Sequence, residues 1–218
     1  MNFEDFQNIK QILSEPKNIV IVPHRNPDGD AYGSSLALYH YLLKLDHKVT
    51  VVSPNDCPEF LKWMPGEDQI VIYESDTKNA TAILQEAEII FTLDFNALHR
   101  VGDRMYQALE KLDPMYVMID HHQQPEDFAK FTYSDSSVCS TCQMLYQFID
   151  KLDDLKKIDS DIATCLYAGI LTDTGSFRFP ATTSETHRIV ANLLDKGANN
   201  SEIYNKIHNV SSYNRLQL

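Results

Sequence analysis

The sequence predicts an α/β protein with a doubly wound, mainly parallel sheet that is flanked by helices and followed by a helical C-terminal part. Short apolar runs rich in Val, Ile or Phe alternate with amphipathic segments of helical periodicity, which is typical of this class. The runs are apolar nearly throughout, as expected of parallel strands that are covered on both faces. The length of 218 residues favours one domain.

The expected elements follow from this alternation. Strands are expected at 18–24, 48–53, 88–94 and 115–120. Helices are expected at 30–46, 97–113, 138–154, 159–175, 184–198 and 201–210. Ser184 is the expected cap of the 184–198 helix and Gly197 its stop. The stretch 211–218 shows no helix stop, so the chain is expected to finish inside an element.

Composition argues against several classes of protein. With 19 basic and 31 acidic residues, a formal charge of −12 and no stripe of Lys and Arg, the chain is not expected to bind long duplex nucleic acid. No apolar run approaches the ~18 residues that cross a bilayer, and the N-terminus is unlike a signal peptide, so a cytoplasmic location without membrane attachment is expected. The CSTC stretch at 139–142 is interpreted as helical thiols rather than half of a zinc site.

Metal-binding side chains follow three of the four expected strands. They are His24, Asp28 and Asp30 after the first strand, Asp94 at the end of the third, and Asp120, His121 and His122 at the end of the fourth. Asp173 follows a helix that could pack over the same edge. A single Asp at a strand end is usually a helix cap or turn former. Because parallel strands present their carboxyl ends on one edge, the set as a whole is expected to converge there.

Five carboxylates and three imidazoles in one place require compensating positive charge. No lysine cluster lies nearby in the sequence, which leaves cations. Carboxylate and imidazole without thiolate suit Mn²⁺, Mg²⁺, Fe²⁺ or Zn²⁺, and the number of ligands suits two ions. Two adjacent divalent ions are a standard device for displacement at phosphorus, so phosphate-ester hydrolysis is the leading hypothesis.

Two arginines are candidates for contact with a phosphate group. Arg100 follows Asp94 closely enough to face the same crevice, or it is a surface charge of a helix. Arg178 lies in TDTGSFRF (172–179) and either faces an anionic substrate or pairs with an acidic neighbour. The sequence leaves both choices open.

Four motifs occur in a fixed order, HRNPDGDAYGSS (24–35), LDFNALHR (93–100), IDHH (119–122) and AGILTDTGSFRF (168–179). Together they resemble the four motifs of the DHH phosphoesterases, named for the sequence at 120–122. Within that superfamily the chain is most similar to the nanoRNase branch. That branch degrades very short oligoribonucleotides and dephosphorylates 3′-phosphoadenosine 5′-phosphate, so a short single-stranded oligoribonucleotide or small nucleotide is the implied substrate.

The resemblance implies a role for each motif residue. Two Mn²⁺ ions, or Mg²⁺ or other divalent ions in their place, would bind at the strand ends. The first would be held by His24 and Asp28, and the second by Asp30, His121 and Asp173, with Asp94 bridging both. His122 would contact the scissile phosphate, and Asp120 would orient a ligand imidazole or hydrogen-bond the backbone. The implied mechanism is attack on phosphorus by a metal-bridging hydroxide, without a covalent intermediate.

Relatives in this family continue into a second, DHHA1 domain that binds the far end of the substrate. Residues 1–195 are therefore expected to form the DHH catalytic domain and residues 196–218 the start of a linker helix, in a fragment or truncated product. The alternatives are a phosphodiesterase for linear or cyclic dinucleotides and, in another class, a non-catalytic metal- or nucleotide-binding module. Pyrophosphatase and 5′ exonuclease activities fit the sequence less well, and a homodimer stays an open expectation.

Overall fold

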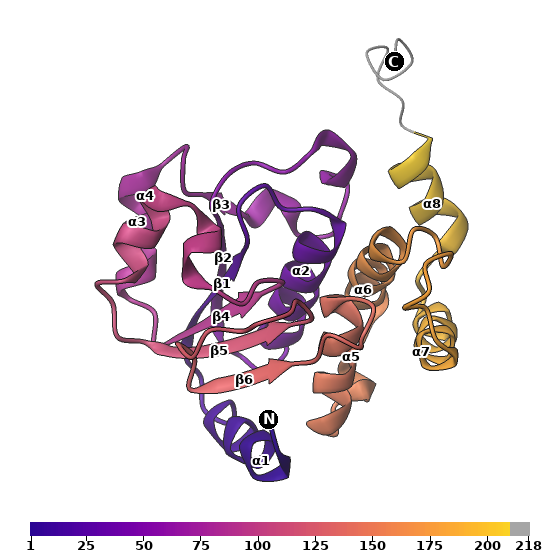
Figure 1. Ribbon diagram of the computed structural model, residues 1–218, viewed down its shortest axis with the longest axis horizontal. Helices are drawn as coiled ribbons and strands as arrows, with labels where there is room; N and C mark the ends of the chain where they lie inside the picture. The colour runs from indigo at the N-terminus through magenta and orange to yellow at the C-terminus, as the bar shows by residue number, and fades with distance from the viewer. Residues whose placement is uncertain (210–218) are drawn as a thin grey trace.

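The computed structural model describes residues 1–209, which include a six-stranded sheet. Its strand order is β3-β2-β1-β4-β5-β6, and every neighbouring pair is parallel (Figure 1). The strands are β1 (Asn18–Pro23), β2 (Lys48–Ser53), β3 (Val71–Ile72), β4 (Ile89–Leu93), β5 (Met115–Asp120) and β6 (Phe131–Ser134). This is the doubly wound arrangement that the sequence predicts, which is confirmed.

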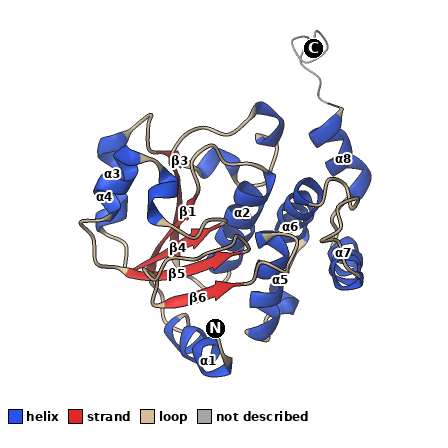
Figure 2. Ribbon diagram, in the orientation of Figure 1, coloured by secondary structure: helices blue, strands red, loops and turns tan. Residues whose placement is uncertain are grey.

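Helices cover both faces of the sheet (Figure 2). One face packs against α1 (Phe3–Ile12), α2 (Gly29–Leu43), α5 (Thr141–Lys151) and α6 (Ser160–Asp173). The other face packs against α3 (Thr77–Gln85) and α4 (Asp103–Leu109). Beyond α6 lie α7 (Ser184–Asp195) and α8 (Asn200–His208), which both contact it. Within residues 1–209, no helix combines the length and the apolar character that spanning a bilayer requires.

Alternation along the strands explains why the sheet has two cores. On β1, Ile19 and Ile21 point into the core beneath α2, whereas Val20 and Val22 point into the core beneath α3 and α4. All four side chains are fully buried. Apolar residues are therefore needed at consecutive positions, which is the continuous run seen in the sequence.

The four expected strands are present, and the structure adds two that the sequence analysis did not predict. β3 has 2 residues and β6 has 4, and only Phe131 of β6 is buried, so neither carries a strong apolar signal. The helix α3 was also not predicted. The expected stretch 211–218 lies outside the described residues.

Most helix ends differ from the prediction by one to three residues, and two differences have a clear local cause. The expected helix at 97–113 is divided into a 3₁₀ helix at Leu98–Val101 and α4, because Gly102 between them adopts φ +86°. The cap of α7 is Thr183 rather than Ser184. Thr183 accepts a hydrogen bond from the backbone N–H of Thr186, and the Thr186 hydroxyl accepts one from the backbone N–H of Thr183.

Close packing of α2 against α6 depends on glycine. A Cβ atom added at Gly33 of α2 would lie 2.6 Å from the backbone oxygen of Cys165 on α6, and one at Gly29 of α2 would lie 2.4 Å from Thr172 Oγ1 on α6. Both distances are shorter than van der Waals contact allows. The two helices therefore approach backbone to backbone, which brings Asp30 near the start of α2 close to Asp173 at the end of α6.

We predict that Gly33→Ala destabilises the protein by about 1–2 kcal/mol, because the clash with a backbone oxygen outweighs the helix propensity gained. Thermal unfolding should show a fall in Tm of about 3–6 °C. The matched control is Ser35→Ala on the same helix, which removes a buried hydroxyl without a hydrogen-bond partner. An unchanged Tm for Gly33→Ala would contradict the close packing described.

Candidate metal centre

The candidate centre lies where the direction of the sheet's winding changes. The chain leaves β1 into α2 on one face and leaves β4 toward α4 on the other, so a crevice opens beyond the carboxyl ends of these adjacent strands. Pro23 and Leu93 are paired across the two strands, which places the next residues, His24 and Asp94, side by side. His24 Nε2 lies 3.5 Å from Asp94 Oδ2.

Asp94 also faces the residues that follow β5. Its Oδ1 lies 3.5 Å from His121 Nε2 and 3.9 Å from His122 Nδ1. The two oxygens of one buried carboxylate thus face different histidines. Three groups of side chains have ligand atoms within 4.8 Å of one another: His24, Asp28 and Asp94; Asp94, His121 and His122; and Asp30, His121 and Asp173.

The local structure explains how three of the carboxylates are placed. Asp28 caps α2, where its Oδ1 accepts hydrogen bonds from the backbone N–H groups of Asp30 and Ala31 at 3.0 and 3.1 Å. Asp94 adopts φ +66°, a left-handed conformation that turns the chain directly after β4. Asp173 is the last residue of α6, and its Oδ2 lies 3.4 Å from His121 Nε2.

Hydrogen bonds to backbone carbonyl groups determine which ring nitrogen of each facing histidine donates. His24 Nδ1 lies 2.8 Å from the carbonyl oxygen of Arg25, and His121 Nδ1 lies 3.2 Å from that of Val138. A carbonyl only accepts, so Nδ1 carries the hydrogen in each neutral ring and Nε2 carries the lone pair. In both rings that lone pair faces a carboxylate oxygen, an arrangement that a cation between the two acceptors satisfies.

Asp120 holds the other histidine. Its fully buried carboxylate accepts hydrogen bonds from the His122 backbone N–H at 2.9 Å and from the ring Nδ1 at 2.7 Å. The hydrogen bond from the ring raises the pKa of His122, and the positive charge of Arg100 opposes that rise. The sequence analysis expected Asp120 to orient a ligand imidazole. The imidazole that it contacts is that of His122, which the resemblance assigns to the phosphate.

Charge in the centre is not neutralised by fixed cations. Burial, followed by repulsion from neighbouring carboxylates, raises the pKa of both Asp30 and Asp94 well above the ordinary value. Burial also raises the pKa of Asp173. Among residues 1–209, histidines are the only basic side chains within ion-pair distance of these carboxylates. Carboxylates and imidazole lone pairs without thiolate form a donor set that fits divalent cations such as Mn²⁺ or Mg²⁺.

The two candidate arginines differ in position. Arg100 is exposed and close enough to His122 to affect its pKa, which places it beside the centre. Arg178 is also exposed, but its Nε donates a hydrogen bond to the carbonyl of Gly175 at 2.6 Å, within its own loop. This contact replaces the acidic partner considered from the sequence.

The sequence analysis missed Thr141, because it examined the CSTC stretch for its cysteines. All four cysteines are free and buried. The Thr141 hydroxyl donates a hydrogen bond to Asp94 Oδ1 at 2.8 Å. Ser140 followed by Thr141 is a typical helix start, but this local pattern does not indicate a contact with Asp94.

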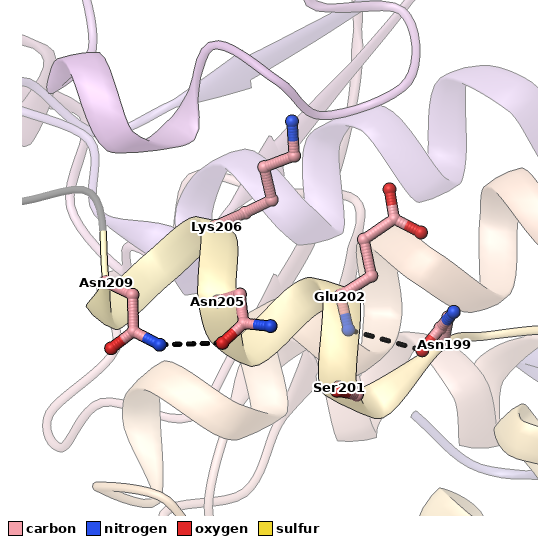
Figure 3. Close-up of a pocket in the computed structure, with 6 residues that line it drawn as sticks. All are labelled: Asn199, Ser201, Glu202, Asn205, Lys206 and Asn209. Carbon is pink, nitrogen blue, oxygen red and sulfur yellow. Dashed lines mark hydrogen bonds between the residues drawn. The ribbon is translucent and has the colours of Figure 1, made fainter.

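Two other features lie apart from this centre. A depression of about 530 Å³ is lined by residues of α8 and its ends, namely Asn199, Ser201, Glu202, Asn205, Lys206 and Asn209 (Figure 3). Asp56, Cys57 and Glu67 form a further small group. Its Asp56 already pairs with Lys62 at 2.8 Å, and burial raises the pKa of the Cys57 thiol to about 11, so the thiol stays protonated near neutral pH.

We predict that Asp94→Asn stabilises the metal-free protein near neutral pH. The folded-state pKa of Asp94 lies above its unfolded value, so its contribution to stability falls as the pH rises through that window. Asparagine removes the charge and tolerates the left-handed backbone. Thermal unfolding in a chelator should show a Tm higher by about 3 °C, and the difference should shrink at acidic pH.

Divalent cations provide the control for this prediction. Added Mn²⁺ should raise the Tm of the wild-type protein more than that of Asp94→Asn, because the variant has lost a charged ligand. If Asp94→Asn were less stable than the wild type in chelator, the claim that the charge of Asp94 destabilises the metal-free protein would be wrong.

Comparison with known proteins is consistent with this geometry. Residues 18–170 match the family model described as "DHH family, N-terminal domain". A bifunctional oligoribonuclease and PAP phosphatase NrnA of Thermus thermophilus is 34% identical over 216 residues, which cover 98% of this chain and 61% of that protein. The chain thus spans about three-fifths of the length of this curated relative.

Solved structures agree with the sequence comparison. An exopolyphosphatase-related protein from Bacteroides fragilis superposes with a TM-score of 0.95 at 38% identity, over 99% of this chain and 63% of that one. Exonuclease RecJ bound to manganese shares the fold, with a TM-score of 0.51 at 14% identity over 89% of this chain and 48% of that one. The resemblance drawn from the four motifs is confirmed, and the chain belongs to the DHH family.

Proposed function

We propose that this chain carries the catalytic part of a metal-dependent phosphoesterase that hydrolyses short oligoribonucleotides and 3′-phosphoadenosine 5′-phosphate. The observation that carries the proposal is the position of Asp94, whose Oδ2 lies 3.5 Å from His24 Nε2 and whose Oδ1 lies 3.5 Å from His121 Nε2. The name of the Thermus thermophilus relative, an oligoribonuclease and PAP phosphatase, supports the choice of substrates.

The three groups of ligand atoms suggest two cation positions that share Asp94. One would be held by His24, Asp28 and Asp94, and the other by Asp30, Asp94, His121 and Asp173. We take Mn²⁺ as the first choice of metal, because mixed carboxylate and imidazole ligands suit it. Bound divalent cations would supply Lewis acidity toward the phosphate ester and toward water.

The protein's own contribution is to bind and orient the phosphate. Asp120 fixes the His122 ring and favours its protonated form, so the imidazolium is available to donate a hydrogen bond to a phosphate oxygen. The His122 side chain is 41% exposed, as contact with a substrate requires. Arg100 adds positive charge on the same side of the centre.

We assign the catalytic unit to residues 1–195 and the start of a linker to 196–218, of which the structure describes residues 196–209, including α8. Every proposed ligand lies between residues 24 and 173. A cytoplasmic location and a homodimer stay predictions.

The first test is hydrolysis of a diadenylate and of 3′-phosphoadenosine 5′-phosphate with Mn²⁺. We expect release of mononucleotide and of phosphate, respectively, and loss of both in a chelator. Asp94→Asn should lower kcat by roughly a thousandfold, because both cation positions lose a charged ligand. The matched control is Asp113→Asn, an exposed carboxylate that precedes β5 at the opposite edge of the sheet.

Two results would redirect the proposal. Hydrolysis of linear or cyclic dinucleotides with 3′-phosphoadenosine 5′-phosphate left intact would favour a dinucleotide phosphodiesterase. Calorimetric binding of nucleotide without hydrolysis in saturating Mn²⁺ would favour a non-catalytic binding module.

A second test concerns the phosphate contact. We predict that Arg100→Gln raises KM by about tenfold with a smaller change in kcat, because a charge-assisted contact to phosphate is lost. Arg188→Gln is the matched control, since Arg188 pairs with Glu185 on α7. An unchanged KM for Arg100→Gln would show that Arg100 does not contact the substrate. The variant Arg178→Gln in the same assay tests whether Arg178 contributes to substrate binding.

A further inference from the structure

The first turn of α5 contacts two carboxylates of the centre. The Thr141 hydroxyl donates to Asp94 Oδ1 at 2.8 Å, and the Thr141 backbone N–H donates to Asp30 Oδ2 at 2.6 Å. The backbone N–H of Cys142 donates to Asp30 Oδ1 at 2.9 Å. One residue therefore reaches both an aspartate of α2 and the aspartate that follows β4.

These contacts are buried and come from a part of the chain that is held firmly. Ser140 and Thr141 are 0% exposed, and Ser140 caps α5 by accepting the Gln143 N–H at 3.0 Å. Cys142 Sγ occupies the space over Gly169 of α6 and donates to the Asp30 carbonyl oxygen of α2. The start of α5 therefore packs against both α2 and α6. The Thr141 hydroxyl consequently has little freedom to move away from Asp94.

Asp94 has few other restraints on its carboxylate. Its backbone N–H bonds to the Ile119 carbonyl, which fixes the chain but not the orientation of the side chain. Within residues 1–209, Thr141 is the one side chain that donates a hydrogen bond to this carboxylate. The rotation that directs one oxygen toward His24 and the other toward His121 therefore depends on this hydroxyl.

We propose that Thr141 is a positioning residue that sets the orientation of Asp94, and its distance from Asp30, so that the two cation positions form together. The inference rests on the proposed function, because it concerns the same centre. Thr141 acts through the carboxylates and does not itself touch metal or substrate. Its backbone N–H and that of Cys142 hold Asp30, and its hydroxyl, which mutation can remove, holds Asp94.

A purely structural role makes a different prediction. If the hydroxyl served only to satisfy a buried polar atom, its loss would lower Tm and leave metal affinity unchanged. If it orients Asp94, its loss weakens metal binding, because partners of metal-binding side chains typically change affinity by about 10–100-fold.

The experiment is a titration of the metal-free protein with Mn²⁺, followed by electron paramagnetic resonance of the free ion. Thr141→Val removes the hydroxyl with almost no change in shape and should weaken Mn²⁺ binding by about tenfold, whereas Thr141→Ser should stay within about threefold of wild type. The control is Thr92→Val, two residues before Asp94 on β4, which removes a buried hydroxyl without a partner and should leave binding unchanged. Where Thr141→Val folds poorly, Thr141→Ala provides the same loss.

Kinetics with the diadenylate complete the test. Thr141→Val should lower kcat by about tenfold at saturating Mn²⁺ and change KM little, and Thr141→Ser should restore kcat. Wild-type Mn²⁺ affinity and kcat in both Thr141→Val and Thr141→Ala would overturn the proposal, as would equal losses in Thr92→Val. Weakened Mn²⁺ binding in a protein that hydrolyses neither nucleotide would support Thr141 and refute the proposed function. A wild-type protein that binds no Mn²⁺ would refute both.

Discussion

Negative charge buried at the edge of the sheet is the constraint on which the rest of the structure depends. Asp30 and Asp94 are 1% and 2% exposed, and burial and mutual repulsion favour their neutral forms. Backbone N–H groups and one hydroxyl compensate only part of this charge. A proton or a bound cation relieves the remainder, so the features that make the charged centre costly in the metal-free protein are those that suit it to bind metal.

The fold brings this charge together through backbone geometry. The parallel strands β1, β4 and β5 are far apart in the sequence but end side by side in the sheet. Their ends place His24, Asp94 and Asp120 in one row. The glycine contact between α2 and α6 then brings Asp30 and Asp173 over that row. A change in helix packing would therefore move ligands on both helices at once, and stability and metal binding are linked at this interface.

The sequence alone was sufficient to predict those features that a local pattern determines. Strands buried on both faces, and acidic residues directly after them, predict the sheet and the convergence of the ligand side chains. It was insufficient where tertiary contact decides. Thr141 and Asp94 are 47 residues apart, and nothing in either segment indicates their hydrogen bond. The cap of α7 shows the same limit locally, because Thr183 and Ser184 are both good caps and the reciprocal bond with Thr186 selects the first.

The distribution of the ligands suggests a division of labour within the proposed enzyme. All proposed metal ligands come from the segment that ends with α6, whereas α7 and α8 contribute none among the described residues. In the proposed enzyme, the chemistry at phosphorus would thus depend on one α/β unit. Recognition of a whole nucleotide requires contacts with its base and its sugar. The side chains proposed to bind metal are carboxylates and imidazoles, which suit a cation and a phosphate group. The reaction at phosphorus and the recognition of base and sugar would then involve different residues. Substrate preference could therefore change while the metal centre and its reaction stay the same.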